Sequence, residues 1–282
     1  MDAKVRRIGF AYNPTSDQAV VLRDRTSGWA TERGLEHWAA PAADREALHR
    51  QLPGTDVLVV LGGDGTFLRA ARAVIEDDVP LLGINVGKVG FLSKVEQEAT
   101  ERVLGQLVEG AYSLEPRMAL EGRIIRKGAA HGERLLALND VVIARGSLAR
   151  VVRLDTSIDS SHLASFVADG LVVSSPTGST GYSFSAGGPI LGPTARHLVV
   201  TPIAGYLTTI RSVVVGPEAV VRCRVVDAHE ALVSVDGRED IPLAVGDIVE
   251  VRAIDRPVRL VEPDGSVPFW DLFREKVALL PS

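Results

Sequence analysis

The sequence contains a single cysteine, and this scarcity excludes several classes of protein. Cys223 has no second thiol in the chain to pair with, so a disulfide-stabilised scaffold is excluded. Because Cys223 lies in a run of alternating apolar residues, we expect it to be a small buried hydrophobe. The six histidines are scattered without the spacing of metal ligands, so the sequence predicts no protein-bound metal site.

Long apolar runs and basic clusters are also missing. No stretch of 18 apolar residues occurs, so we expect no membrane-spanning segment, and no membrane partner is predicted. Residues 1–10 lack the apolar core of a signal peptide and are predicted to begin the first strand, which favours a cytoplasmic location. The net charge is −5 and lysine and arginine form no cluster, which argues against a nucleic-acid partner.

The pattern of strands and helices divides the 282 residues into two predicted domains. Residues 1–112 alternate strand-like and helix-like segments, which predicts an α/β domain with a parallel sheet wrapped by helices. Residues 113–259 contain short alternating runs separated by turns, which predicts an all-β domain, either a sandwich or a layered sheet. The apolar stripe within residues 269–280 predicts a C-terminal helix that packs back on the first domain, so residues 260–282 are assigned to that domain.

Several segments are predicted within each domain. In the first domain, strands are expected over residues 7–12, 35–39, 57–61 and 80–86, and helices after Ser16 and over residues 44–52, 66–76 and 96–109. In the second domain, residues 135–143 are expected to form one strand, and residues 220–226 and 231–235 a hairpin.

The turn Gly-Gly-Asp-Gly-Thr at residues 62–66 follows an apolar run that suits a strand buried on both faces. Three glycines in four positions are costly in backbone entropy, so such a turn usually lets a ligand approach the backbone closely. The helix expected after it presents unpaired N–H groups and the positive end of its dipole, which favour phosphate binding. The turn matches neither the Walker pattern nor the Gly-x-Gly-x-x-Gly dinucleotide fingerprint.

Asp64 is unusual within a phosphate-binding turn, because its negative charge repels phosphate. A carboxylate at this position suits a base that faces a substrate hydroxyl, or a ligand of bound Mg²⁺. The alternative is that Asp64 caps the helix, which is common at such a position. A cap does not explain the three surrounding glycines, so we favour a functional role.

Residues 169–189 form a second cluster, rich in serine, threonine and glycine. Hydroxyl groups and bare backbone N–H groups suit a polar ligand such as a nucleotide, and Tyr182 offers a ring for stacking. The alternative is a long flexible surface loop. We favour a binding site, because residues 180–186 have the pattern of a short ordered helix.

Asn139 and Asp140 interrupt the otherwise apolar run of residues 135–143. Two polar side chains at the centre of a strand are costly unless they are paired. They pair locally if the strand carries a bulge. They also suit the vicinal hydroxyls of a ribose, because a carboxylate accepts hydrogen bonds and an amide both donates and accepts them.

Together these segments resemble the NAD kinase family. The resemblance rests on five segments, namely Gly-Gly-Asp-Gly-Thr at 62–66, Gly-Ile-Asn-x-Gly-x-x-Gly-Phe-Leu at 83–92, Asn-Asp at 139–140, Ser-Pro-Thr-Gly-Ser-Thr-x-Tyr-x-x-Ser-Ala-Gly-Gly-Pro at 175–189, and Val-Ser-Val-Asp-Gly at 233–237. It implies phosphorylation of the 2′-hydroxyl of the adenosine ribose of NAD by ATP, giving NADP. It also implies Mg²⁺ or another divalent cation carried with ATP, and a homodimer or homotetramer.

The resemblance also implies roles for individual residues. Asp64 is expected to be the general base. The residues expected to bind NAD or ATP are Gly62, Gly63, Gly65, Thr66, Arg69, Asn139, Asp140, Arg150, Asp169, Thr180, Gly181, Tyr182, Ser183, Phe184, Ser185, Tyr206 and Arg238. Three of these positions depart from the family pattern: Gly181 replaces the usual Ala, Tyr206 replaces His, and Arg238 stands where Gln is frequent.

Two other functions are compatible with parts of the sequence. Diacylglycerol kinases, sphingosine kinases and phosphofructokinases share Gly-Gly-Asp-Gly, but a lipid kinase needs an apolar channel where residues 174–188 carry hydroxyls and glycine. A non-catalytic NAD(P) sensor is suggested only by Tyr206. The sequence leaves open whether ATP or inorganic polyphosphate is the phosphoryl donor, and whether NAD or NADH is preferred.

Overall fold

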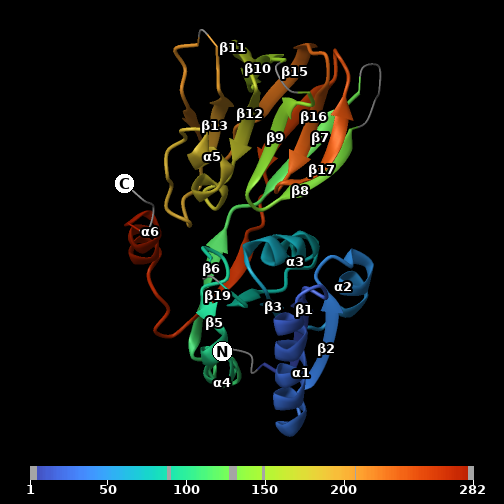
Figure 1. The fold of residues 1–282 in the computed structure, drawn as a ribbon, viewed down its shortest axis with the longest axis vertical. Coiled ribbons are helices and arrows are strands. Elements are labelled where there is room, and N and C mark those ends of the chain that lie inside the picture. Colours follow the sequence, from blue (N-terminus) through green and yellow to red (C-terminus); the bar gives the residue numbers. More distant parts are fainter. Residues whose placement is uncertain (1–4, 88–89, 127–131, 148–149, 207, 279–282) are drawn as a thin grey trace. The chain divides into compact units, whose positions relative to one another are not determined.

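The computed structural model describes residues 5–87, 90–126, 132–147, 150–206 and 208–278 (Figure 1). Its contacts divide the chain into two compact units. The first comprises residues Met1–Pro116 and Val258–Ser282, and the second comprises Arg117–Pro257. The sequence-based boundary after residue 112 falls at the start of β6 (Tyr112–Arg117), a strand of the first sheet.

The first unit contains a largely parallel sheet. Its strands follow the order β2 (Glu36–Pro41), β1 (Arg7–Tyr12), β3 (Val57–Leu61), β4 (Leu81–Asn85), β19 (Val258–Pro263) and β6, with β5 (Val95–Glu96) paired to β4. The pairs of β1 with β2 and β3, and of β4 with β3, β5 and β19, are parallel. Every residue of β3 and β4 is buried, as expected for central strands covered on both faces.

Helices cover both faces of this sheet. Leu22 of α1 (Asp17–Glu32) and Leu104 of α4 (Thr100–Glu109) share a hydrophobic core with Ile84 of β4. Gly83 points to the opposite face, because neighbouring residues of a strand alternate, and there it meets Phe67 of α3 (Asp64–Asp77). The remaining helices are α2 (Arg45–Gln51), which contacts α3, the 3-10 helix η1 (Gln97–Ala99), and α6 (Phe269–Ala278). Within the described part of the chain, no helix combines the length and apolarity needed to cross a membrane.

The helix starts in the first unit follow local sequence signals. Ser16 accepts the N–H of Ala19 and Asp44 accepts the N–H of Ala47, so both act as N-caps. Two boundaries differ from the predictions. The helix α3 begins at Asp64 and not at residue 66, and the segment predicted as one helix over 96–109 enters α4 only after β5 and η1.

The second unit consists of two six-stranded antiparallel sheets. One sheet has the order β11 (Ser161–Ala168), β10 (Val152–Ile158), β15 (Val221–Asp227), β18 (Ile248–Ala253), β7 (Leu120–Ile125) and β8 (Glu133–Ala137). The other has the order β14 (Val213–Val215), β13 (Leu198–Ile203), β12 (Gly170–Ser174), β9 (Asp140–Arg145), β16 (Ala231–Val235) and β17 (Arg238–Leu243). A single hydrophobic core takes residues from both sheets, so the predicted sandwich is confirmed.

Two strand predictions in this unit are wrong. The strands β15 and β16 do not form a hairpin, because β15 pairs with β10 and β18 while β16 pairs with β9 and β17 in the other sheet. The run 135–143 is not one strand either, since it breaks into β8 and β9 at Leu138 and Asn139. Alternating apolar residues predict strands correctly here but do not identify the strand partners.

Cys223 is a buried hydrophobe in the sandwich core, as predicted. Its Sγ lies 3.9 Å from Thr156 Oγ1, and burial raises the pKa of the thiol to about 12. The thiolate is the reactive form of cysteine, so burial suppresses both access and ionisation.

We therefore expect Cys223 to be inert toward thiol reagents in the native protein. Labelling with a chromogenic disulfide at pH 8 should be at least ~100-fold slower in buffer than in denaturant, because only unfolding exposes a thiol of ordinary pKa. Rapid stoichiometric labelling of native protein, without loss of secondary structure, would contradict this placement of Cys223.

Candidate active site

The glycine-rich turn connects the end of β3 to the start of α3. Gly62 continues the pairing of β3 with β4, because its N–H donates to the carbonyl of Ile84 at 2.9 Å. A Cβ atom on Gly62 would lie 2.6 Å from Thr66 Oγ1, so the fold itself requires glycine there. A Cβ atom on Gly63 or Gly65 would meet nothing within 4 Å. The space beside these two glycines is open to a ligand.

Asp64 does not cap the helix, so that alternative is wrong. The N-cap of α3 is Gly63, and no side chain caps this end. The Asp64 carboxylate instead accepts three backbone N–H groups, with Phe91 donating to Oδ2 at 2.9 Å and Leu92 and Ser93 donating to Oδ1 at 3.1 and 3.0 Å. A carboxylate has about four acceptor positions, so one position remains on Oδ2.

Gly90 makes this arrangement possible. A Cβ atom at Gly90 would overlap the carboxylate of Asp64. The N–H of Gly90 donates to the carbonyl of Ser93 at 3.1 Å, which closes the turn that carries the three donors. The glycine motif at 83–92 therefore accommodates the aspartate of the motif at 62–66.

Thr66 and Arg69 lie in the first two turns of α3. Thr66 is buried, and its N–H donates to the carbonyl of Gly63 at 2.9 Å. The Nε atom of Arg69 is buried without a hydrogen-bond partner among the described residues. Leaving a buried donor unpaired costs on the order of 1–3 kcal/mol. An anion bound beside Arg69 would give its Nε atom a hydrogen-bond partner.

In the second unit, Asn139 and Asp140 lie at the break between β8 and β9. The carboxylate of Asp236 accepts the N–H groups of Leu138, Asn139 and Asp140 at 3.0, 2.8 and 3.2 Å. On the other side, the carbonyl of Asn139 accepts the N–H of Ser175 at 2.8 Å. These bonds replace the strand ladder, so the polar pair is held by a carboxylate clamp and not by the strand bulge considered above.

The side chains of Asn139 and Asp140 retain capacity for a ligand. The Oδ1 atom of Asn139 is buried without a hydrogen-bond partner among the described residues. Asp140 is 5% exposed, and burial together with the nearby charge of Asp236 raises its pKa to about 7. A carboxyl group that titrates near neutrality can donate or accept a hydrogen bond, which suits a ligand with several hydroxyls.

The segment after β12 is ordered and not a flexible loop. It forms the 3-10 helix η2 (Gly178–Thr180) and the short helix α5 (Tyr182–Ser185). Its hydroxyls are largely bonded within the protein, since Ser175 donates to the carbonyl of Leu138 and Ser179 to that of Pro176, both at 2.6 Å. Ser175 and Ser179 therefore have less hydrogen-bonding capacity left for a ligand than the sequence suggested.

The predicted contacts in η2 and α5 differ in exposure. Ser183 is fully buried, and its Oγ atom lies 3.4 Å from Thr201 Oγ1. The rings of Tyr182 and Phe184 are 47% and 41% exposed, so they can reach a ligand without rearrangement. Ser185 is exposed, whereas Thr180 and Gly181 are half-buried.

Asp169 is part of an ion pair that the sequence did not reveal. The guanidinium of Arg145 bonds it in a two-point contact, with Nε 2.8 Å from Oδ1 and a terminal nitrogen 3.1 Å from Oδ2. Both side chains keep some exposure, so the pair orients Asp169 without enclosing it. Arg145 ends an ordinary strand, and no local signal in the sequence identifies it.

The remaining predicted residues lie apart from these clusters. Arg150 is exposed in the connection from β9 to β10, and Arg238 is half-buried at the start of β17. Tyr206 is 65% exposed, and its N–H donates to the carbonyl of Val167 at 2.7 Å. The backbone of Tyr206 is therefore fixed while its ring remains accessible.

In the first unit, a parallel sheet places a carboxylate and an open glycine turn at a helix N-terminus. This combination indicates the class of protein to which the chain belongs. Phosphate groups bind at such helix ends, and a fixed carboxylate beside them can accept the proton of a hydroxyl. This geometry is suited to a phosphotransferase that acts on an alcohol group.

Comparison with known proteins identifies the family. The ATP-NAD kinase N-terminal domain matches residues 30–112, and the ATP-NAD kinase C-terminal domain matches residues 138–263. An NAD kinase from Syntrophotalea carbinolica is 37% identical over 282 residues, covering 97% of this chain and 98% of the relative. One from Symbiobacterium thermophilum is 43% identical over 224 residues, covering 79% and 78%. The chain belongs to the NAD kinase family, whose activity is the ATP-dependent phosphorylation of NAD.

Solved structures share the fold. Yeast NADH kinase complexed with NADH aligns with a TM-score of 0.84 at 22% identity, covering 100% of this chain and 89% of that chain. An NAD kinase from Archaeoglobus fulgidus in complex with ATP aligns with a TM-score of 0.78 at 24% identity, covering 97% and 99%. The α/β unit, the β sandwich and the C-terminal helix thus form the fold predicted from the sequence.

The buried carboxyl of Asp140 predicts a pH dependence of stability. The folded-state pKa of Asp140 is about 7 and its ordinary value is 3.8, so folded protein retains a proton that unfolded protein loses between these values. The free energy of unfolding should therefore fall as pH rises from about 4 to about 7, and stay low above it. Asp140→Asn should remove this slope and raise the free energy of unfolding at pH 8 by about 2–4 kcal/mol, at about 1.4 kcal/mol per pKa unit.

Urea unfolding at pH 5 and pH 8 measures the effect. Asp227→Asn is the matched control, because Asp227 is exposed in β15, and its profile should follow that of the unaltered protein. Parallel pH profiles for Asp140→Asn and the unaltered protein would contradict the protonation of Asp140 in the folded state.

Proposed function

We propose that this enzyme transfers the terminal phosphoryl group of ATP to the 2′-hydroxyl of the adenosine ribose of NAD, giving NADP, with Asp64 as the general base. The observation that carries the proposal is the carboxylate of Asp64. Three backbone N–H groups orient it, and one acceptor position remains on Oδ2. A carboxylate held in this way is ready to accept a hydrogen bond from a hydroxyl.

The reaction needs positioning more than covalent participation by the protein. The 2′-hydroxyl donates its hydrogen bond to Oδ2 of Asp64. As the ribose oxygen forms its bond to phosphorus, the bond from phosphorus to the ADP oxygen breaks and the hydroxyl proton passes to the carboxylate. The products are NADP, ADP and a protonated Asp64, which returns its proton to solvent.

The first turns of α3 supply a seat for phosphate. The N–H groups at the helix N-terminus and the open space beside Gly63 and Gly65 favour an anion that approaches the backbone. Thr66 adds a hydroxyl, and Arg69 adds a guanidinium whose buried Nε lacks a partner among the described residues. Gly62 is assigned to shaping the turn, since a Cβ atom there would meet Thr66.

We assign binding of the dinucleotide to the second unit. Asn139 and Asp140 suit the ribose hydroxyls. The buried Oδ1 of Asn139 accepts no hydrogen bond from the described residues, and the pKa of Asp140 is raised to about 7. Exposed aromatic rings suit stacking on the bases. The further contacts that we propose are Arg150, Asp169, Thr180, Gly181, Tyr182, Ser183, Phe184, Ser185, Tyr206 and Arg238. Because its side chain is buried, Ser183 would contribute through its backbone.

A divalent cation is expected to enter the site bound to the phosphates of ATP. Among the residues that the structure describes, no group of three or more histidine, cysteine and acidic side chains could form a protein cage for a metal ion. Mg²⁺ commonly binds through substrate phosphates with few protein ligands, which agrees with such a site. When bound, the cation neutralises charge on the phosphates. A homodimer or homotetramer remains a prediction from the family resemblance, and a cytoplasmic location remains a prediction from the sequence.

The identity of the product tests the proposal directly. Purified protein with NAD, ATP and Mg²⁺ should yield NADP, and phosphorus NMR should place the new phosphate on the 2′ oxygen of the adenosine ribose. A 3′-phosphate would contradict the assigned acceptor. Absence of any phosphorylated dinucleotide would contradict the function as a whole.

Gly65 offers a second prediction, because it is free of packing constraints. Ala is more favourable than Gly by up to about 1 kcal/mol in a helix interior, and the gain is smaller in the first turn, where Gly65 lies. A Cβ atom on Gly65 meets nothing within 4 Å. Gly65→Ala should therefore leave stability equal or slightly higher. We expect kcat/KM for ATP to fall at least ~10-fold, because the methyl group enters the space assigned to phosphate.

Gly105→Ala is the matched control. Gly105 lies in α4, and a Cβ atom there also meets nothing within 4 Å. This substitution should raise stability by up to about 1 kcal/mol without changing kinetics. If steady-state kinetics found Gly65→Ala as active as Gly105→Ala, phosphate would not bind at this turn.

A further inference from the structure

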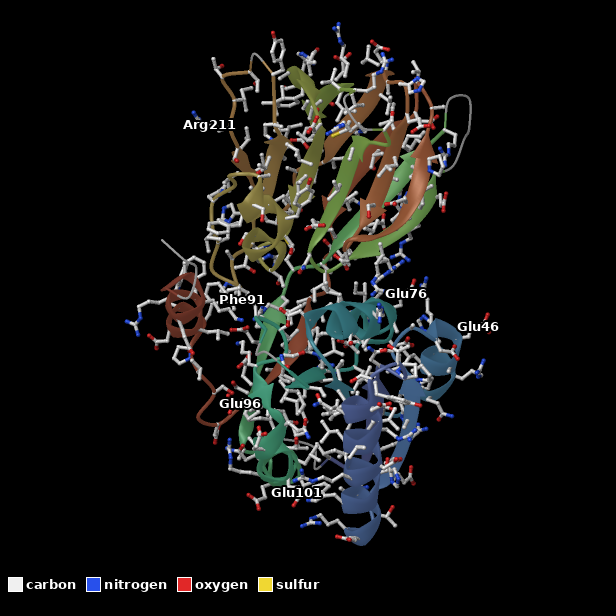
Figure 2. All side chains as sticks on the ribbon, viewed as in Figure 1. Glu46, Glu76, Phe91, Glu96, Glu101 and Arg211 are labelled. Atoms are coloured by element: carbon white, nitrogen blue, oxygen red, sulfur yellow. The ribbon has the colours of Figure 1, made fainter. Side chains whose placement is uncertain are left out.

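Phe91 connects the Asp64 carboxylate to the C-terminal helix. Its backbone N–H donates to Asp64 Oδ2 at 2.9 Å. Its ring centroid lies 6.0 Å from that of Phe269 and 6.3 Å from that of Phe273, both in α6. The ammonium of Lys276 lies 5.2 Å from the centre of the same ring. Figure 2 shows Phe91 beside α6.

The aromatic residues of α6 form one cluster around this contact. Phe269 and Phe273 stack with centroids 6.3 Å apart, and Trp270 packs edge-on against both at 4.9 and 6.0 Å. Such ring pairs add to the gain from burial, and a cation over a ring adds further attraction. The ring of Phe91 is therefore held from several sides while Trp270 remains 56% exposed.

The attachment of α6 to the first unit is uneven along its length. Leu272, Glu275 and Lys276 line a cleft of about 690 Å³, together with residues of the segment 94–103. A helix bordered by such a cleft is not packed over its whole surface. The aromatic cluster at Phe91 is thus a localised point of attachment, and Phe91 itself belongs to the turn that binds Asp64.

We propose that α6 is a positioning element for the catalytic base, acting through Phe91. The inference rests on the proposed role of Asp64. Three N–H donors must converge on one carboxylate, and hydrogen bonds weaken steeply when their angles are poor. Gly90 has no side chain with which to anchor the turn, so the ring of Phe91 supplies the anchor. Phe269 and its neighbours in α6 hold that ring and thereby fix the direction of Asp64 Oδ2.

A purely structural role for α6 predicts a different pattern of effects. If α6 only stabilised the first unit, removing one of its rings would lower stability without changing turnover of the folded enzyme. If α6 positions Asp64, the same change lowers kcat while leaving KM for NAD nearly constant, because substrate binding does not depend on the base. It also loosens the backbone N–H groups of residues 91–93.

The test substitutes Phe269 and measures kinetics together with amide hydrogen exchange of residues 91–93. Phe269→Ala should lower kcat by about tenfold to a hundredfold, with KM for NAD changed less than about twofold. Exchange at Leu92 and Ser93 should accelerate. Phe269→Tyr retains the ring and should restore both readouts. Should Phe269→Ala fail to fold, Phe269→Leu preserves apolar burial without the ring and should show the same changes in smaller degree.

Two comparisons complete the test. Arg274→Ala is the matched control in the same helix, because the Arg274 side chain is 80% exposed and pairs with Asp271 outside the aromatic cluster. It should leave kcat and the exchange of residues 91–93 unchanged. In protein that carries Asp64→Asn, Phe269→Ala should cause no further loss of kcat, because both changes act on one group. Independent, multiplicative losses would overturn the positioning role.

The failure of this inference is distinguishable from failure of the proposed function. If Asp64→Asn left kcat undiminished, Asp64 would not be the general base, and the positioning role of α6 would be contradicted with it. A large loss in Asp64→Asn with no effect of Phe269→Ala on kcat or on exchange would overturn the role of α6 alone.

Discussion

The Asp64 carboxylate accepts three backbone N–H groups, and the proposed site in the first unit depends on this interaction. It joins the turn after β3 to the turn after β4, two adjacent strands of a parallel sheet. Ligand sites of such sheets lie at the carboxyl ends of the strands, where these two turns meet. The interaction accounts for Gly90, whose missing side chain leaves space for the carboxylate. The positive end of the α3 dipole also favours the negative charge of Asp64 in the first turn of the helix.

The second unit uses the same device. The carboxylate of Asp236 gathers the N–H groups of Leu138, Asn139 and Asp140, as that of Asp64 gathers those of residues 91–93. In each unit a carboxylate holds an irregular backbone segment in place and leaves neighbouring polar atoms available. The clamp in the second unit has an electrostatic consequence, because the charge of Asp236 and burial together raise the pKa of Asp140. A group shifted in this way is typical of a functional site.

Features set by neighbouring residues were predicted well. The strand Val57–Leu61 and the cap at Ser16 agree with the structure because apolar runs and capping side chains act over a few positions. The backbone N–H groups that donate to Asp64 were not predicted, because they lie 27 to 29 residues away in the sequence. The break at Asn139 was missed for the same reason, since its clamp at Asp236 is 97 residues distant. The false hairpin arose because alternation identifies strands but not the sheet that each one joins.

The central claim is that Asp64 accepts the proton of the ribose hydroxyl, and the single-turnover rate of phosphoryl transfer in Asp64→Asn tests it most directly. An amide of the same size retains the acceptor for the N–H groups of Leu92 and Ser93, loses the one for Phe91, and cannot take the proton. With NAD and ATP bound at saturation, the account predicts a rate at least ~100-fold below that of the unaltered enzyme, because a general base contributes factors of about 10² to 10⁴. The affinity for NAD, measured by calorimetry on the same protein, should remain within about threefold, since binding does not require a base. A single-turnover rate close to that of the unaltered enzyme would contradict the assignment of Asp64.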